Sequence, residues 1–102
     1  PVQLNGRVAD MDAINKIATD HNLIIIEDSC QALGAKYKGQ FAGTFGLTGT
    51  FSFFPAKTLG CFGDGGAVVT NSDKVAKKIR MIRDHGRDPS DGKVKMFGFN
   101  LL

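Results

Sequence analysis

Apolar residues recur at helical spacing near the start of the chain. We predict a helix over residues 11–21, with Asp10 as its N-cap and Asn22 after its last turn. Four apolar residues fall on one face of this segment: Met11, Ile14, Ile17 and Ala18. The stripe predicts that this face packs against the rest of the domain.

A second helical pattern lies nearer the C-terminus. We predict a helix over residues 73–84, with Ser72 as N-cap and Gly86 beyond its end. Its buried stripe would be formed by Val75, Ile79 and Ile82, and lysines and arginines occupy the other positions. Residues 87–95 follow as a polar loop.

The residues after the first helix form a continuous apolar run, Leu23 to Ile26. A run without alternation predicts a strand buried on both faces, as in a parallel sheet. A helix followed by such a strand is half of a βαβ unit, and residues 1–4 are a candidate remnant of the preceding strand. We therefore expect an α/β fold.

The middle of the chain is rich in glycine and predicts turns between short strands. Residues 35–38 and 40–42 are expected to form a hairpin around Gly39. Further strands are predicted over residues 50–54 and 66–70, with a turn before the second of them. No linker divides the sequence, so its 102 residues predict a single domain.

The charge balance of the chain does not favour a nucleic-acid partner. The chain has 13 basic and 10 acidic residues, and much of the net charge of +3 comes from residues 74–83. No aromatic side chains alternate with these charges, so a solvated helix face is the favoured interpretation.

Cysteine spacing and hydropathy exclude other classes of protein. Cys30 and Cys61 have no zinc-site spacing, so we expect no metal site and a reducing, cytoplasmic location. No apolar run approaches the length of a membrane span. The chain begins without Met and ends on the apolar residues 96–102, and we expect it to be part of a longer protein.

Candidate chemistry centres on Lys57, which lies among aromatic and apolar neighbours. Such surroundings disfavour the charged ammonium, and a neutral amine can form a Schiff base with a carbonyl. Asp28 follows the apolar run, where the carboxyl ends of strands form ligand crevices, and can hold a cationic group. Ser52 lies five positions before Lys57 and can donate to a phosphate. Each residue taken singly also fits an ordinary surface or strand-end role.

Several segments together resemble the DegT/DnrJ/StrS family of pyridoxal-phosphate-dependent sugar aminotransferases. Residues 26–35, Ile-Glu-Asp-Ser-Cys-Gln-Ala-Leu-Gly-Ala, resemble its Glu-Asp-x-x-Gln-Ala-x-Gly-Ala motif. Residues 51–60 resemble its lysine motif, and residues 63–70 its Gly-Glu/Asp-Gly-Gly segment. Arg-Asp-His-Gly at 83–86 and Gly-Phe-Asn at 98–100 match two weaker features.

The resemblance implies a role for each candidate site residue. Lys57 would form the Schiff base with pyridoxal phosphate and later shuttle a proton. Asp28 would pair with the pyridinium nitrogen and Gln31 with the phenolic oxygen. Ser52 would hold the phosphate, and Asn100 would reach the cofactor phosphate of the neighbouring subunit in a homodimer.

The resemblance also implies where this chain belongs in the family's architecture. Residues 1–102 would be a fragment of the fold type I aminotransferase large domain, a mostly parallel sheet flanked by helices. The N-terminal part and the C-terminal small domain of family members are absent, so we expect little turnover from this fragment alone. Leu102 stands where the family often has Arg.

The function implied is transfer of an amino group, with glutamate as expected donor, to a keto group of a nucleotide-linked sugar. Lys57 favours this reaction over the dehydratase relatives that have His there. Two alternatives remain: another fold type I pyridoxal-phosphate enzyme that acts on an amino acid, and a non-catalytic cofactor-binding or regulatory relative. The sequence names neither the sugar, the carbon position nor the nucleotide.

Overall fold

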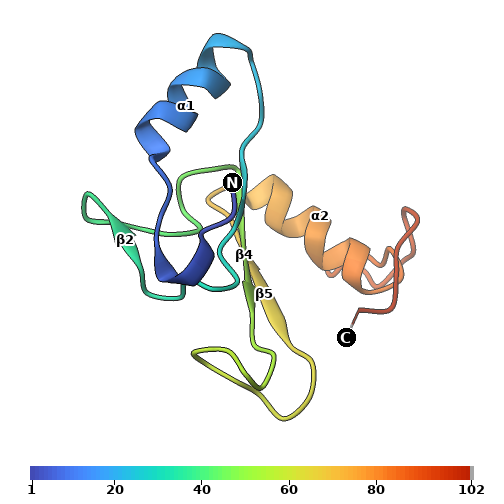
Figure 1. Ribbon diagram of the computed structural model, residues 1–102. Coiled ribbons are helices and arrows are strands. Elements are labelled where there is room, and N and C mark those ends of the chain that lie inside the picture. The colour runs from blue at the N-terminus through green and yellow to red at the C-terminus, as the bar shows by residue number, and fades with distance from the viewer. Residues whose placement is uncertain (102) are drawn as a thin grey trace. The chain divides into compact units, whose positions relative to one another are not determined.

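The computed structural model describes residues 1–101 (Figure 1), which form two compact units that meet in sequence between Asn71 and Ser72. The first unit contains a short 3-10 helix, one α-helix and five strands: η1 (Leu4–Gly6), α1 (Met11–Asp20), β1 (Ile26–Asp28), β2 (Lys36–Tyr37), β3 (Gln40–Phe41), β4 (Thr48–Ser52) and β5 (Gly66–Val69). The second contains α2 (Asp73–Arg83) and the segment after it. No linker-like composition marks this division.

The first predicted helix is confirmed as α1, which ends one residue earlier than expected. Asp10 is its N-cap, and its carboxylate accepts a hydrogen bond from the amide of Ala13 at 3.2 Å. This bond, together with one from the Tyr37 hydroxyl, lowers the pKa of Asp10. Met11 and Ala18 are buried, whereas Ile17 is exposed, so only part of the apolar stripe is covered within residues 1–101.

The main sheet has the strand order β1-β4-β5 and is mixed. Figure 1 labels its neighbouring strands β4 and β5. β1 runs parallel to β4, in a register that aligns Asp28 with Thr50, and β4 runs antiparallel to β5. Val2 adds a parallel bridge to Asp28 on the other side of β1. The parallel pair together with the helices confirms the predicted α/β class.

The prediction of a buried strand over residues 23–26 is wrong. Only Ile26 belongs to β1, and the side chains of Leu23 and Ile24 are 60% and 72% exposed. Within the described residues, strand pairing begins at Ile26: β4 pairs with residues 26–28, and Val2 forms a bridge to Asp28. An apolar run predicts the tendency to be buried, but burial needs partner elements on both faces.

The other strand predictions hold with small shifts. β4 begins and ends two residues earlier than the predicted segment 50–54, because its register with β1 starts at Thr48. β5 confirms the strand predicted from Gly66. β2 and β3 form the predicted hairpin, and its turn has positive φ at Lys38 and Gly39.

The second unit is organised around the predicted helix, α2. Ser72 caps it by accepting a hydrogen bond from the amide of Val75. The predicted stripe on α2 is half-buried, and no side chain of the helix is fully buried. Two amides from the end of the chain cap carbonyls of its last turn: Phe99 donates to Ile82 O, and Leu101 donates to Arg83 O.

Candidate functional site

Asp28, the last residue of β1, presents an ionised carboxylate at the carboxyl end of that strand. Its Oδ1 accepts a hydrogen bond from the amide of Cys30 at 3.1 Å. Hydrogen bonds from the Cys30 thiol and amide lower the pKa of Asp28, and the positive charge of Lys57 lowers it further. Asp28 is therefore a fixed negative charge at the strand end where the sequence predicted one.

Lys57 lies in the turn that follows β4, where its amide donates to Phe54 O at 2.8 Å. Its side chain is half-buried, and within residues 1–101 its ammonium forms no hydrogen bond or ion pair. Its charge acts on both Asp28 and Cys30. Lys57 thus acts electrostatically on Asp28, which lies 29 positions earlier in the sequence.

Cys30 is the additional member of this group. Its thiol lies 3.7 Å from the hydroxyl of Thr50. Burial raises the pKa of Cys30, and the contact with Asp28 raises it further, while Lys57 opposes both effects. The thiol is therefore protonated at neutral pH and serves as a hydrogen-bond donor beside Asp28.

Ser52 closes β4, two positions beyond Thr50. Residues two apart on a strand share a face of the sheet, so Ser52 lies on the same face as Thr50. The Ser52 hydroxyl oxygen accepts a hydrogen bond from the amide of Phe54 at 3.2 Å. Its proton is left for another acceptor, which is compatible with the predicted contact to a phosphate.

Gln31 and Asn100 occupy different settings. The side-chain carbonyl of Gln31 accepts a hydrogen bond from the amide of Asn5 at 3.0 Å, which leaves the amide NH₂ as a donor. Asn100 belongs to the second unit, where it is exposed and forms an antiparallel bridge with Asp84. Leu102, where the family often has Arg, lies outside the described residues.

Glu27 was missed by the sequence analysis, although it directly precedes Asp28. Its side chain is fully buried. One carboxylate oxygen accepts from the amides of Phe45 at 2.6 Å and Gly46 at 3.0 Å. The other accepts from the amide of Gly43 at 2.8 Å and from the side-chain amide of Gln3 at 3.0 Å.

Glu27 fastens the segment that leads into β4. Gln3 is itself fully buried and accepts a hydrogen bond from the amide of Ala9, so Glu27 and Gln3 together connect three segments of the first unit. The backbones also approach closely here: a Cβ added to Gly49 would lie 2.2 Å from Gly43 O. The sequence offered one signal for this role. Successive residues of a strand face opposite sides of the sheet, so the residue before an exposed Asp28 is expected to face inward.

The described residues show no grouped metal ligands, no disulfide and no membrane-spanning helix. Within residues 1–101, no three His, Cys, Asp or Glu side chains are grouped as metal ligands, and both cysteines are free. None of the helices described over this range has the length and apolar character needed to cross a membrane.

Comparison with known proteins places these residues in a family. The profile described as the DegT/DnrJ/EryC1/StrS aminotransferase family matches residues 1–101. Among curated relatives, the chain is 54% identical over 89 residues to a pleiotropic regulatory protein of Geobacillus stearothermophilus, covering 87% of this chain and 24% of that protein. It is 51% identical over 86 residues to the dTDP-3-amino-3,4,6-trideoxy-alpha-D-glucose transaminase of Streptomyces venezuelae, covering 84% and 23%. The chain thus spans about a quarter of the length of the curated relatives it matches.

Solved structures agree with this assignment. A DegT DnrJ EryC1 StrS aminotransferase from Brucella abortus superposes with a TM-score of 0.91 at 41% identity, covering 98% of this chain and 27% of that one. The GDP-4-keto-6-deoxy-D-mannose-3-dehydratase of E. coli, solved with bound hydrated PLP, superposes with a TM-score of 0.84 at 32% identity, covering 97% and 30%. The chain is therefore an α/β fragment of a fold type I aminotransferase.

Proposed function

The chain belongs to the DegT/DnrJ/EryC1/StrS aminotransferase family, and we propose that its full-length parent is a pyridoxal-phosphate-dependent aminotransferase. The reaction is transfer of an amino group, with glutamate as donor, to a keto group of a nucleotide-linked sugar. The observation that carries the proposal is the electrostatic effect of Lys57, whose ammonium forms no ion pair within residues 1–101, on the ionised carboxylate of Asp28 at the end of β1.

The donor set at this site fits pyridoxal phosphate. The pyridinium N–H needs an anionic acceptor, and Asp28 remains ionised because its pKa is lowered. The aldehyde carbon needs a lysine amine, and Lys57 has no competing ion pair within residues 1–101. Ser52 retains a hydroxyl proton for a phosphate oxygen. When bound, the cofactor supplies an electron sink for negative charge that develops on the substrate carbon.

Each residue then has a defined task. Asp28 would hold a proton on the pyridine nitrogen, and the Cys30 thiol and amide keep that carboxylate in place. Gln31 would donate its free amide protons to the phenolic oxygen, and Ser52 would anchor the phosphate. Lys57 would hold the cofactor covalently through Nζ and would move a proton at that same atom.

The proposal extends to the parts of the protein beyond this chain. We place residues 1–102 in the cofactor-binding large domain, with an N-terminal part and a C-terminal small domain elsewhere in the parent. Asn100 reaches the cofactor phosphate of a second subunit, so the working unit is a homodimer. The enzyme acts in the cytoplasm, where its two cysteines remain reduced.

A regulatory role is the second candidate, because one relative at 54% identity is named a pleiotropic regulatory protein. Such a protein can keep the cofactor site without turnover. Replacement of Lys57 by alanine separates the two roles: an aminotransferase loses activity, whereas a regulator whose function needs no chemistry keeps that function.

The proposal is tested by reducing the Schiff base, which labels the lysine that binds the cofactor. The full-length parent is incubated with pyridoxal phosphate, reduced with borohydride and digested, and the modified peptide is identified by mass spectrometry. We expect the label on Lys57. Label on another lysine, such as Lys36, overturns the assignment. The variant Lys57→Arg, which keeps the positive charge, should take up no label at this site.

A further inference from the structure

Three arginines surround a pocket in the second unit. Arg80 and Arg83 lie three positions apart on the last turns of α2, and Arg87 follows the turn at the helix end. Together with residues of the following loop they line a pocket of about 320 Å³. This volume lies at the small end of the range for ligand sites.

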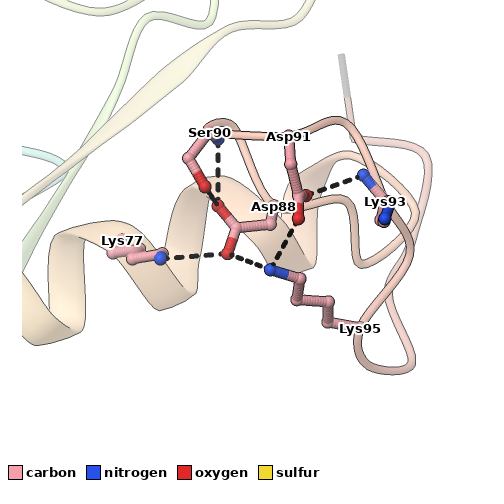
Figure 2. Close-up of polar contacts among 6 residues, drawn as sticks. All are labelled: Lys77, Asp88, Ser90, Asp91, Lys93 and Lys95. Atoms are coloured by element: carbon pink, nitrogen blue, oxygen red, sulfur yellow. Dashed lines mark hydrogen bonds and ion pairs between the residues drawn. The ribbon is translucent and has the colours of Figure 1, made fainter.

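The acidic residues of the pocket leave most of this positive charge uncompensated. Figure 2 shows that the buried Asp88 carboxylate is already engaged by Lys77 at 3.0 Å and Lys95 at 3.2 Å. Asp84 lies 4.0 Å from the Nε of Arg87, the outer limit of an ion pair. The guanidinium groups of Arg80 and Arg83 form no hydrogen bond or ion pair within residues 1–101.

The helix end itself does little to repel an anion. A helix C-terminus carries partial negative charge on its free carbonyls, which would oppose anion binding. Here three of the last carbonyls are hydrogen-bonded: Met81 O accepts from the amide of Gly86, Ile82 O from that of Phe99, and Arg83 O from that of Leu101. The guanidinium groups therefore set the sign of the local field.

We propose that the pocket formed by Arg80, Arg83 and Arg87 binds the diphosphate group of the nucleotide-linked substrate. Guanidinium groups are planar donors that match phosphate oxygens in bidentate pairs. This inference rests on the proposed function, which supplies a substrate with two linked phosphates. By contrast, the pocket between α1 and residues 23–26 in the first unit is lined by apolar side chains and suits no phosphate.

The position of the pocket within its unit favours the substrate as the source of the phosphates. The end of α2 that carries Arg83 is hydrogen-bonded to the segment of Asn100, through Leu101 N to Arg83 O and a bridge between Asp84 and Asn100. If Asn100 reaches the cofactor of the neighbouring subunit, the arginine pocket lies beside that same site. The substrate's diphosphate would then bind to one subunit while its sugar reacts in the other.

The test uses the full-length parent and the variants Arg80→Gln and Arg83→Gln. Both side chains are exposed, so neither change is expected to unfold the protein. Lys74→Gln is the matched control, because Lys74 is an exposed cation on the first turn of α2 and does not line the pocket. Calorimetry measures binding of inorganic pyrophosphate, and steady-state kinetics measures KM and kcat for the nucleotide sugar.

We expect each arginine variant to weaken pyrophosphate binding and to raise KM about tenfold, with kcat little changed, because one charge-assisted hydrogen-bond pair is lost. Lys74→Gln should behave as the unmodified protein does. Equal effects in all three variants, or none in the arginine variants, overturn the proposal. Stronger binding of a short DNA duplex than of pyrophosphate through the same arginines also overturns it.

Failure of the two proposals can be told apart. Pyrophosphate binding is measured without turnover, whereas the proposed function is tested by the label on Lys57 and by conversion of the cofactor by glutamate alone. An enzyme that is labelled at Lys57 and reacts with glutamate, but binds pyrophosphate equally in all variants, keeps its function and loses this site.

Discussion

The two units each contain a buried carboxylate that organises a loop, and the two carboxylates are neutralised in different ways. Glu27 in the first unit accepts hydrogen bonds from three backbone amides and the Gln3 side chain, all uncharged donors. Asp88 in the second unit accepts from Ser90 and pairs with Lys77 and Lys95 (Figure 2). A buried charge is costly unless it is hydrogen-bonded or paired, and each unit solves this problem with different groups.

The difference indicates how firmly each loop is held. The donors to Glu27 are mostly backbone amides that are buried or half-buried, so water reaches them less readily than it reaches an exposed side chain if Glu27 is lost. The side chains of Lys77 and Lys95 are 55% and 46% exposed, so water can solvate them in the absence of Asp88. The loop that leads into β4 should therefore be the more rigid of the two.

The largest effect is expected from Glu27→Gln. The new amide NH₂ would face two hydrogen-bond donors, and unsatisfied buried donors cost about 1–3 kcal/mol each, so we expect a loss of about 3 kcal/mol. Hydrogen exchange of the Phe45 and Gly46 amides in the full-length protein should accelerate about a hundredfold. Asp64→Asn, a change at an exposed turn, is the control. Unchanged protection at Gly46 would show that Glu27 does not hold this loop.

A smaller effect is expected from Asp88→Asn. The asparagine oxygen can still accept from Ser90, and the two lysines become solvated, so the loop over residues 87–95 should loosen without disrupting α2. Amide exchange at Ser90 should accelerate, by less than at Gly46 in Glu27→Gln. Lys93→Gln is the control, because the Lys93 ammonium makes no ion pair within residues 1–101. A larger effect for Asp88→Asn than for Glu27→Gln would reverse the comparison.

Neither buried carboxylate was identified from the sequence, whereas the features that depend on near neighbours were. The caps at Asp10 and Ser72 and the hairpin around Gly39 use contacts only a few residues apart, and all three were predicted. Glu27 is satisfied by Gln3 and by amides 16 to 19 positions later. Such pairings depend on tertiary structure, which no local pattern encodes.

In the candidate site too, residues with a local sequence signal were predicted, and contacts that depend on tertiary structure were not. Asp28 and Lys57 were singled out from their local surroundings, and in the structure the charge of Lys57 lowers the pKa of Asp28. Cys30 joins them through its thiol: its place two residues after Asp28 is plain in the sequence, but its role as a donor to Asp28 was not predicted. The apolar run over residues 23–26 misled because apolar composition alone does not reveal which faces are covered.

The next largest effect is expected from acidification, which should change exchange protection in the loop held by Asp88 only at low pH. Hydrogen bonds from Ser90, with Lys77 and Lys95, place the pKa of Asp88 well below its ordinary value. A carboxylate with a lowered folded-state pKa stabilises fully above its unfolded value, about 3.9, and loses this contribution as the pH falls through the folded value. Exchange protection at Ser90 should therefore exceed that in Asp88→Asn by a constant factor from pH 7 to about pH 4. The advantage should shrink only below that range, and a loss that begins near pH 5 would contradict the lowered pKa.

The smallest effect is expected from salt, and it distinguishes the two carboxylates most directly. At 1 M NaCl the screening length is about 3 Å, so the exposed ends of Lys77 and Lys95 interact less with Asp88. The donors to Glu27 carry no net charge and are buried or half-buried, so screening by salt has little effect on them. Raising NaCl from about 0.05 M to 1 M should accelerate exchange at Ser90 by about twofold relative to Gly46. The same salt step should have less effect in Asp88→Asn, since the ion pairs of Lys77 and Lys95 with residue 88 are gone and only that of Lys95 with Asp91 remains. Parallel changes at Ser90 and Gly46 would mean that the lysines contribute no electrostatic anchoring, and that the Ser90 hydrogen bonds hold the second loop.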